Sequence, residues 1–212
     1  MTLPSLAELV DPAHCVLVTQ EVQEGVVGAA AGLPALAEEA RREALPNIAR
    51  LVAGARRAGV PVVHCLVQRR PDGKGSNDNC RLFQLGRRFP VDLSPGSKGA
   101  ALLPEMGPDP DDIVLARTTG LGPMGGTDLD AVLRNLGARA VVGVGVSVNV
   151  AIPNFVMDAV NRGYWFVLPR DAVAGVPADY ATAVIDTTLL LLAHVVTTDD
   201  VLAAWAGAHR SP

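Results

Sequence analysis

The sequence predicts an α/β fold with a parallel, doubly wound sheet that is covered by helices on both faces. Six apolar, strand-like runs alternate with helical patterns, and most of the turns between them are short, as in βαβ units. Hydrophobic residues make up 49% of the chain but aromatic residues only 4%, so the core must consist mainly of Val, Leu and Ala. Such a core suits parallel strands, which are buried on both faces.

The first half of the chain contains two of the predicted strands, Cys15–Thr19 and Val60–Val67. A helical pattern lies between them over residues 36–58, and Pro46 is expected to kink or divide it. After the second strand, residues 68–99 are polar and rich in Gly, Pro, Asn and Arg. A loop of this length inside a compact domain is usually functional or mobile.

The second half of the chain repeats the strand–helix unit, with four predicted strands over residues 112–117, 138–146, 164–169 and 195–198. The helix after the first of these begins near Thr127, a suitable N-cap, and ends at Gly137. Three more helical patterns span residues 151–162, 178–195 and 197–208. Thr198 or Asp199 is the expected cap of the closing helix.

Length and composition limit the classes of protein that this chain can belong to. The 212 residues suffice for one large domain, and no linker divides them, so we expect a single domain over residues 1–212. A net charge of −4 without a basic stripe argues against a nucleic-acid partner. The N-terminus lacks a signal-peptide pattern, and the apolar run Thr187–Val196 is too short to span a bilayer. We therefore expect a cytoplasmic protein with no membrane partner.

Polar side chains at the carboxyl ends of the strands are the candidate functional residues, because sites in such folds lie there. Glu21 directly follows the first strand, where a carboxyl is either paired or easily protonated, as general acid chemistry requires. Arg117 ends the third strand. A solvated glutamate and a surface arginine are the simpler interpretations, but an acid and a cation at neighbouring strand ends together favour a site. The four histidines show no metal-ligand spacing, so we expect no metal.

Two long segments, "VLVTQEVQEGVVG" and residues 112–175, resemble the isochorismatase-like hydrolase superfamily. This group includes isochorismatases, nicotinamidases and N-carbamoyl amide hydrolases, and the resemblance runs from about residue 14 to about residue 205. It implies a three-layer α/β/α sandwich around a six-stranded parallel sheet, in a homodimer or homotetramer. It also implies a small-molecule substrate. We expect no cofactor.

All three catalytic positions of the resemblance are altered in this chain. The family's Asp, Lys and Cys correspond to Glu21, Arg117 and Ala151. Glutamate keeps the carboxyl, but arginine cannot give up a proton. Alanine removes the nucleophile, so this chain cannot form a covalent acyl-enzyme at that position. The nearby Ser147 corresponds to a position that often shapes the family's oxyanion site, and it has no His or Lys base beside it that would make it a nucleophile.

Isochorismatases offer a precedent, because they carry a small residue at the nucleophile position and hydrolyse a vinyl ether without a covalent intermediate. An acid protonates the enol-ether carbon, and water attacks the resulting cation. By this resemblance Glu21 is the acid or base, Arg117 orients it or the substrate, and Ala151 leaves room for the substrate. Arg117 would, however, favour an ionised Glu21 and oppose the acid role unless burial dominates.

Further residues are expected to contact the substrate, and they are Gln23, Arg69, Asn79, Phe83 and Ser147. Arginine suits a carboxylate substrate because it pairs with it through two hydrogen bonds. The metal motif of nicotinamidases, an Asp and two His after the second strand, lacks both histidines here. A nicotinamidase assignment is therefore disfavoured.

Three hypotheses follow from the altered positions. The first is a hydrolase without a covalent cysteine nucleophile, acting on a small carboxylate-bearing or enol-ether metabolite. The second is a catalytically inactive member that binds a small ligand or scaffolds a partner. The third is that Ala151 replaces the cysteine of a natural protein, although Glu21 and Arg117 would not need to change in that case.

Overall fold

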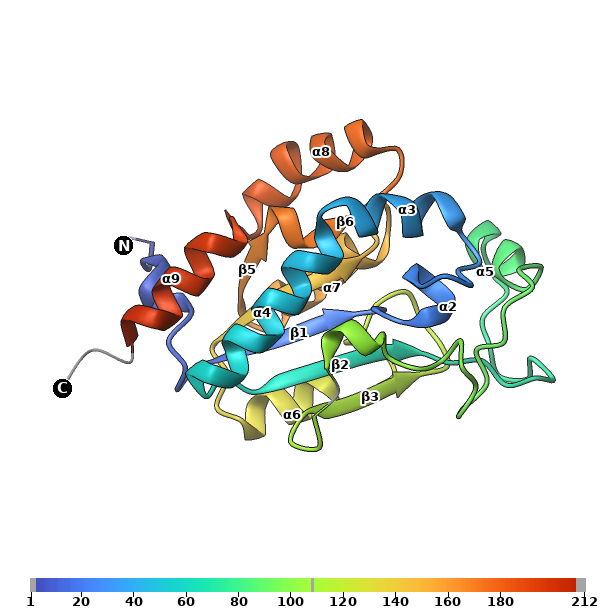
Figure 1. Ribbon diagram of the computed structural model, residues 1–212, viewed down its shortest axis with the longest axis horizontal. Coiled ribbons are helices and arrows are strands. Elements are labelled where there is room, and N and C mark those ends of the chain that lie inside the picture. Colours follow the sequence, from blue (N-terminus) through green and yellow to red (C-terminus); the bar gives the residue numbers. More distant parts are fainter. Residues whose placement is uncertain (1–2, 108, 209–212) are drawn as a thin grey trace.

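The computed structural model describes residues 3–107 and 109–208, and its described strands form one parallel sheet (Figure 1). The strands are β1 (Cys15–Gln20), β2 (Val62–Val67), β3 (Ile113–Arg117), β4 (Ala140–Val146), β5 (Trp165–Pro169), β6 (Val173–Ala174) and β7 (His194–Val196). Their order is β3-β2-β1-β4-β5-β7, and the two-residue β6 pairs with β4. The predicted parallel α/β fold is thus confirmed, with seven strands instead of six because of β6.

Helices cover both faces of the sheet and make it the middle of three layers (Figure 1). The helices are α1 (Leu6–Leu9), α2 (Glu24–Val27), α3 (Pro34–Arg42), α4 (Ala44–Ala58), α5 (Arg81–Gly86), α6 (Leu129–Asn135), α7 (Ala151–Asn161), α8 (Ala178–Thr187) and α9 (Thr198–Ala208). Buried side chains of α3, α4 and α9 form one core cluster with the sheet, and those of α6, α7 and α8 form the other. Both clusters pack against this one sheet, and a single domain over residues 1–212 stays a prediction.

Two helices replace the single helical pattern that residues 36–58 predicted. The break lies at Glu43, whose φ of −143° is outside the helical range, and Pro46 stands in the first turn of α4. A proline is tolerated there because the first N–H groups of a helix have no partner within it. Pro46 therefore helps to begin α4 and does not kink it.

The apolar helix predicted over residues 178–195 is shorter than expected. It ends at Thr187 and is followed by the 3-10 turn η3 (Leu189–Leu191) and by β7. Leu189 is fully buried in this turn, whereas Leu191 is 83% exposed. An apolar run alone does not distinguish a helix from a turn that leads into a strand.

Strands β1 and β4 lie side by side at the centre of the sheet, and the chain turns in opposite directions from them. From β1 it proceeds to β2 and β3 at one edge, and from β4 it proceeds to β5 and β7 at the other. Gly145 permits this pairing, because its φ is +115° and a Cβ there would lie 2.2 Å from the Gln20 carbonyl oxygen. The carboxyl ends of β1 and β4 therefore flank the topological switch point, where ligands bind in this class of fold.

Candidate functional site

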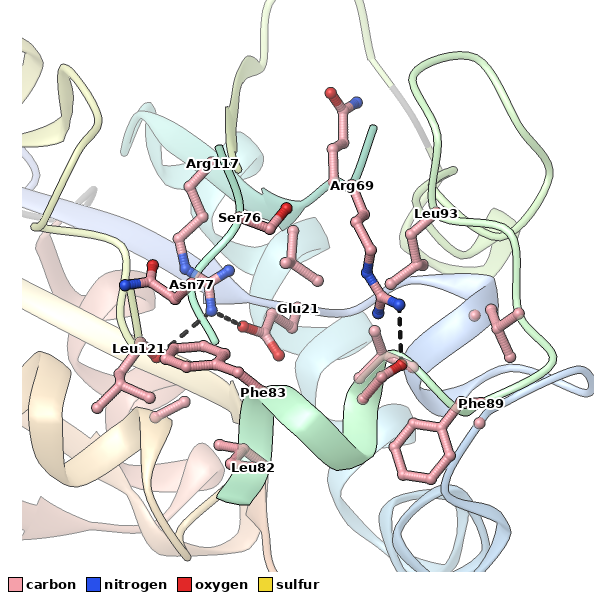
Figure 2. A pocket seen from close by; sticks show the side chains of 18 of the residues that line it. Glu21, Arg69, Ser76, Asn77, Leu82, Phe83, Phe89, Leu93, Arg117 and Leu121 are labelled. Carbon is pink, nitrogen blue, oxygen red and sulfur yellow. Dashed lines mark hydrogen bonds and ion pairs between the residues drawn. The ribbon is translucent and has the colours of Figure 1, made fainter. Parts of the chain in front are cut away.

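A cavity of about 220 Å³ opens at the carboxyl ends of β1 to β4. The segment 68–99, with α5, supplies much of its wall, as the sequence predicted for this long loop (Figure 2). The structure brings most of the candidate residues to this cavity, namely Glu21, Arg69, Phe83, Arg117, Ser147 and Ala151.

Glu21 is held in a defined orientation at the end of β1. Its φ of +55° is the only positive value for a non-glycine residue in the described part of the chain, and its N–H donates to the Cys65 carbonyl at 2.9 Å. The Oε1 atom of Glu21 accepts a hydrogen bond from Gln20 Nε2 at 2.9 Å, and it forms an ion pair with Arg117 Nη2. Oε2 has no hydrogen-bond partner among the described residues. One carboxyl oxygen is thus fixed, and the other remains for chemistry.

Arg117 enters the cavity from the end of β3 and is only 6% exposed. Besides Glu21, its Nη2 contacts the Leu121 carbonyl at 3.4 Å, while its Nε is buried with no partner in the described structure. A buried ion pair must be well hydrogen-bonded to offset the cost of removing both charges from water. The pair holds both side chains in place at the base of the cavity.

Ala151 is the first residue of α7, and its methyl group lines the cavity together with Val150 and Ser147. Its backbone N–H has no acceptor in the described part of the chain, since Val150 and Ile152 both donate to the Ser147 carbonyl. The N-terminus of a helix carries unpaired N–H groups and a partial positive charge. This end of the cavity can therefore stabilise a negative oxygen without offering a nucleophile.

Gln23 and Asn79 do not line the cavity, contrary to our expectation of substrate contacts. Gln23 is fully buried, and its amide bonds to the backbone of Val67 and Ala100 at 2.7–3.0 Å. It ties the end of β2 to the segment before β3 and has no group left for a ligand. Asn79 accepts a 3.4 Å hydrogen bond from the Asn77 amide and lies outside the cavity wall.

Gln20 and Asn77 are polar residues of the site that the predicted set of site residues does not include. Gln20, 1% exposed, holds Glu21 directly, and a polar residue inside an apolar strand was the signal that could have indicated it. Asn77 lines the cavity, and its Oδ1 accepts from the Gly120 N–H at 2.8 Å. No sequence signal separates Asn77 from the other polar residues of its loop, because only the fold brings residue 120 beside it.

The Cys65 thiol of β2 is not placed to act as a nucleophile in this cavity. Burial raises the pKa of Cys65 to about 12, and the residue is absent from the cavity wall. Within the described residues, no cluster of three or more His, Cys, Asp or Glu side chains could hold a metal ion. In the same residues, no helix is long and apolar enough to cross a membrane.

Comparisons with known proteins agree with this architecture. The chain is 32% identical over 198 residues to a ureidoacrylate amidohydrolase, RutB, of Methylorubrum extorquens, covering 84% of this chain and 78% of the relative. The RutB of Agrobacterium fabrum is 26% identical over 195 residues and covers 85% of both chains.

Solved structures show the same fold. An isochorismatase family protein from Burkholderia thailandensis superposes with a TM-score of 0.77 at 25% identity, covering 92% of this chain and 96% of that one. A cysteine hydrolase from Pseudomonas syringae superposes with a TM-score of 0.80 at 22% identity, covering 98% and 100%. The model of the isochorismatase domain matches residues 15–200. The chain therefore belongs to the isochorismatase family of hydrolases.

Proposed function

We propose that this protein hydrolyses a small carboxylate-bearing or enol-ether metabolite without a covalent cysteine intermediate. The observation that carries the proposal is the difference between the two carboxylate oxygens of Glu21. Oε1 is held by Gln20 and Arg117, while Oε2 has no partner among the described residues and lies in a cavity where Ala151 leaves space. A positioned carboxylate of this kind is the usual means of activating water.

In this mechanism Glu21 Oε2 takes a proton from a water molecule, whose oxygen attacks the electrophilic carbon of the substrate. The charge that develops on the substrate oxygen is stabilised by the N–H of Ala151 at the start of α7. Glu21 then returns the proton to the leaving group. For an enol ether the order of proton transfers differs. A protonated Glu21 delivers its proton to the enol-ether carbon, and the carboxylate formed then takes a proton from the water that attacks the resulting cation.

The relatives named ureidoacrylate amidohydrolase make ureido and amide compounds a necessary part of the substrate panel. By the family resemblance, amide hydrolysis uses the cysteine that Ala151 replaces. We therefore expect enol ethers and activated carboxylates to be turned over faster than unactivated amides. We extend the proposal to the cytoplasm, since the three cysteines are free thiols, as is usual in a reducing compartment.

The test compares turnover by the wild type and by Glu21→Gln on isochorismate, related enol ethers and ureido compounds. Loss of the carboxylate is expected to lower kcat by about 10²- to 10⁴-fold, the usual contribution of a general acid or base. Glu24→Gln is the matched control, because Glu24 lies three residues away and does not line the cavity.

Equal rates for the wild type and Glu21→Gln would refute the role of Glu21. The inactive-member alternative makes a different prediction, because it is favoured by the commitment of Glu21 to an ion pair with Arg117. It predicts thermal stabilisation by ligands of the panel with no turnover of any of them.

A further inference from the structure

The cavity wall is more apolar than hydrolysis alone requires. Aliphatic and aromatic side chains from α5 and the residues that follow it line the same cavity as Glu21, namely Leu82, Phe83, Phe89, Val91 and Leu93. Figure 2 shows four of them, Leu82, Phe83, Phe89 and Leu93, around the cavity. A water-activating carboxylate needs only a pocket for the reacting group. This wall must therefore contact a part of the ligand that does not react.

The position of Phe89 is fixed by its packing. A Cβ on Gly32 would lie only 3.0 Å from the Phe89 Cβ and 3.1 Å from its Cγ, so the ring is packed closely over the glycine backbone. Phe83 projects from α5 on the same side of the cavity (Figure 2). Phe89, held by this packing, and Phe83 together offer a surface for a flat or branched apolar group.

Arg69 supplies a cation that Glu21 does not neutralise. Figure 2 shows Arg69 and Arg117 on opposite sides of Glu21, and the carboxylate pairs with Arg117. Arg69 Nη1 donates to the Gly86 carbonyl at 2.8 Å, and within the described structure Arg69 has no carboxylate partner. A guanidinium beside an apolar wall, with donors to spare, suits a ligand carboxylate.

We propose that the cavity takes a monocarboxylate with a single aromatic ring or a branched apolar body, its carboxylate on Arg69 and its body against Phe83 and Phe89. This deepens the proposed function and rests on the same site. The volume of about 220 Å³ lies below the roughly 300–1,000 Å³ of pockets for drug-sized ligands, so one ring is the limit. A polar body would lose its hydration against these rings without gaining hydrogen bonds.

Three probes separate the two contacts: 3-phenylpropionate, its uncharged amide 3-phenylpropionamide, and propionate, which lacks the ring. Isothermal titration calorimetry on the full chain measures their affinities. We expect 3-phenylpropionate to bind about 10- to 100-fold tighter than propionate, as expected for burying one ring. We expect the amide to bind at least tenfold more weakly than the acid, because it cannot pair with Arg69.

Variants assign each contact to a residue. Phe83→Ala should weaken 3-phenylpropionate and leave propionate unchanged, and Arg69→Gln should remove the preference for acid over amide. Arg69→Lys separates loss of the charge from disturbance of the loop. It keeps a positive charge and should therefore retain part of the preference for acid over amide. Leu85→Ala is the control, since Leu85 lies on α5 but outside the cavity wall. Circular dichroism establishes that each variant is folded.

Equal affinities for 3-phenylpropionate and propionate, or for acid and amide, would overturn the inference. Its failure is distinguishable from failure of the proposed function, because the readout is binding. Selective binding without turnover of any substrate supports the ligand class and contradicts the hydrolase proposal. Turnover of polar substrates with equal affinities for the three probes supports the hydrolase proposal and contradicts the ligand class.

Discussion

At the scale of single residues, the site places a largely buried ion pair, Glu21 with Arg117, in the same cavity as the first residue of α7. We propose that Glu21, Arg117 and Ala151 occupy the catalytic positions of the family, with Ala151 in place of the nucleophile. Gln20 adds a second hydrogen bond to Glu21 Oε1. The chemistry that remains is that of a fixed carboxylate beside an unpaired helix N-terminus.

Restoring a thiol tests whether this position still activates nucleophiles. In Ala151→Cys the new thiol stands at the N-terminus of α7 in the same cavity as Arg117, and both lower the pKa of a thiol. We expect iodoacetamide to label it faster than any cysteine of the wild type, measured by mass spectrometry of the intact protein. Cys65, whose pKa burial raises to about 12, should stay unlabelled in both proteins.

Labelling of Ala151→Cys at the rate of wild-type Cys80 would show that the helix terminus does not activate a nucleophile there. Cys80 is the suitable reference, because it is the only cysteine of the three that is not buried.

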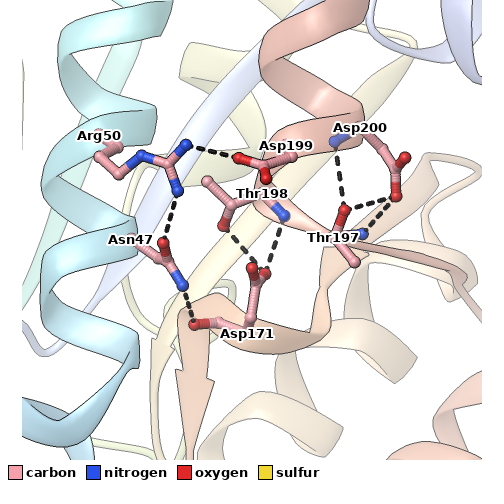
Figure 3. Close-up of polar contacts among 7 residues, drawn as sticks. All are labelled: Asn47, Arg50, Asp171, Thr197, Thr198, Asp199 and Asp200. Carbon is pink, nitrogen blue, oxygen red and sulfur yellow. Dashed lines mark hydrogen bonds and ion pairs between the residues drawn. The ribbon is translucent and has the colours of Figure 1, made fainter.

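At the scale of secondary-structure elements, buried polar networks fix how helices meet the sheet. Asp171, at the end of β5, accepts hydrogen bonds from the Thr198 N–H and hydroxyl at 2.8 and 2.9 Å (Figure 3). Its carbonyl accepts from Asn47 of α4 at 3.0 Å. Asp171 therefore joins α4, β5 and α9, and takes no part in the cavity.

The closing helix is capped one residue earlier than the sequence predicted. The Thr197 hydroxyl accepts from the Asp200 N–H at 3.2 Å, and the Asp200 carboxylate accepts from the Thr197 N–H at 2.9 Å (Figure 3). This reciprocal arrangement is a capping box. The expected caps, Thr198 and Asp199, already stand inside α9.

A second network makes stability depend on pH. His64 of β2 is fully buried, bonded to Thr19 at 2.8 Å and to Asp112 at 3.0 Å, and Asp112 also pairs with Arg56 of α4. Burial lowers the pKa of His64, against the opposing effect of Asp112. The folded protein therefore keeps this imidazole neutral at a pH at which the unfolded chain binds a proton.

The sign of the pH effect follows from linkage. Below about pH 6.5, the ordinary pKa of histidine, the unfolded state binds a proton that His64 in the folded state does not bind. The free energy of unfolding therefore decreases as the pH is lowered. Urea unfolding of the wild type at pH 7.5 and 5.0 should show this loss. His64→Gln should reduce the difference, whereas His194→Gln, at a half-buried position of β7, should not. An unchanged difference in His64→Gln would contradict the assignment.

At the scale of the whole molecule, topology assembles a site from four strand ends. Glu21, Arg69, Arg117 and Ala151 are separated by up to 130 residues in the sequence and share one cavity because parallel strands end at the same edge. The loop that covers this edge determines what can enter.

The molecule also exposes apolar side chains that its own fold does not cover. Tyr180 of α8 and Leu190 and Leu191 of η3 are 48%, 57% and 83% exposed. Together with the family resemblance, this favours the predicted homodimer or homotetramer. Sedimentation velocity should show self-association of the wild type and a shift toward monomer in Leu191→Glu. The matched variant Leu85→Glu, on α5, should leave the distribution unchanged, and a monomeric wild type would contradict the prediction.

The sequence by itself determined the alternation of strands and helices and the alanine at position 151, and it predicted a site at the carboxyl ends of the strands. These are local properties, since hydrophobic period, turn residues and residue identity are all readable along the chain. Six of the eight proposed site residues reached the cavity for the same reason: they follow strands or lie in the loop over them.

Only the tertiary structure decided which polar side chains form hydrogen bonds that hold the fold together and so are not available to a ligand. Gln23 and Asp171 both follow strands, as Glu21 does, yet the first holds a loop and the second caps a helix. Gln20 ends β1, and its side chain holds the Glu21 carboxylate. Whether a side chain has a free donor or acceptor depends on partners far along the chain, and strand order brings those partners together. That is why the sequence could place the site and the structure was needed to assign its chemistry.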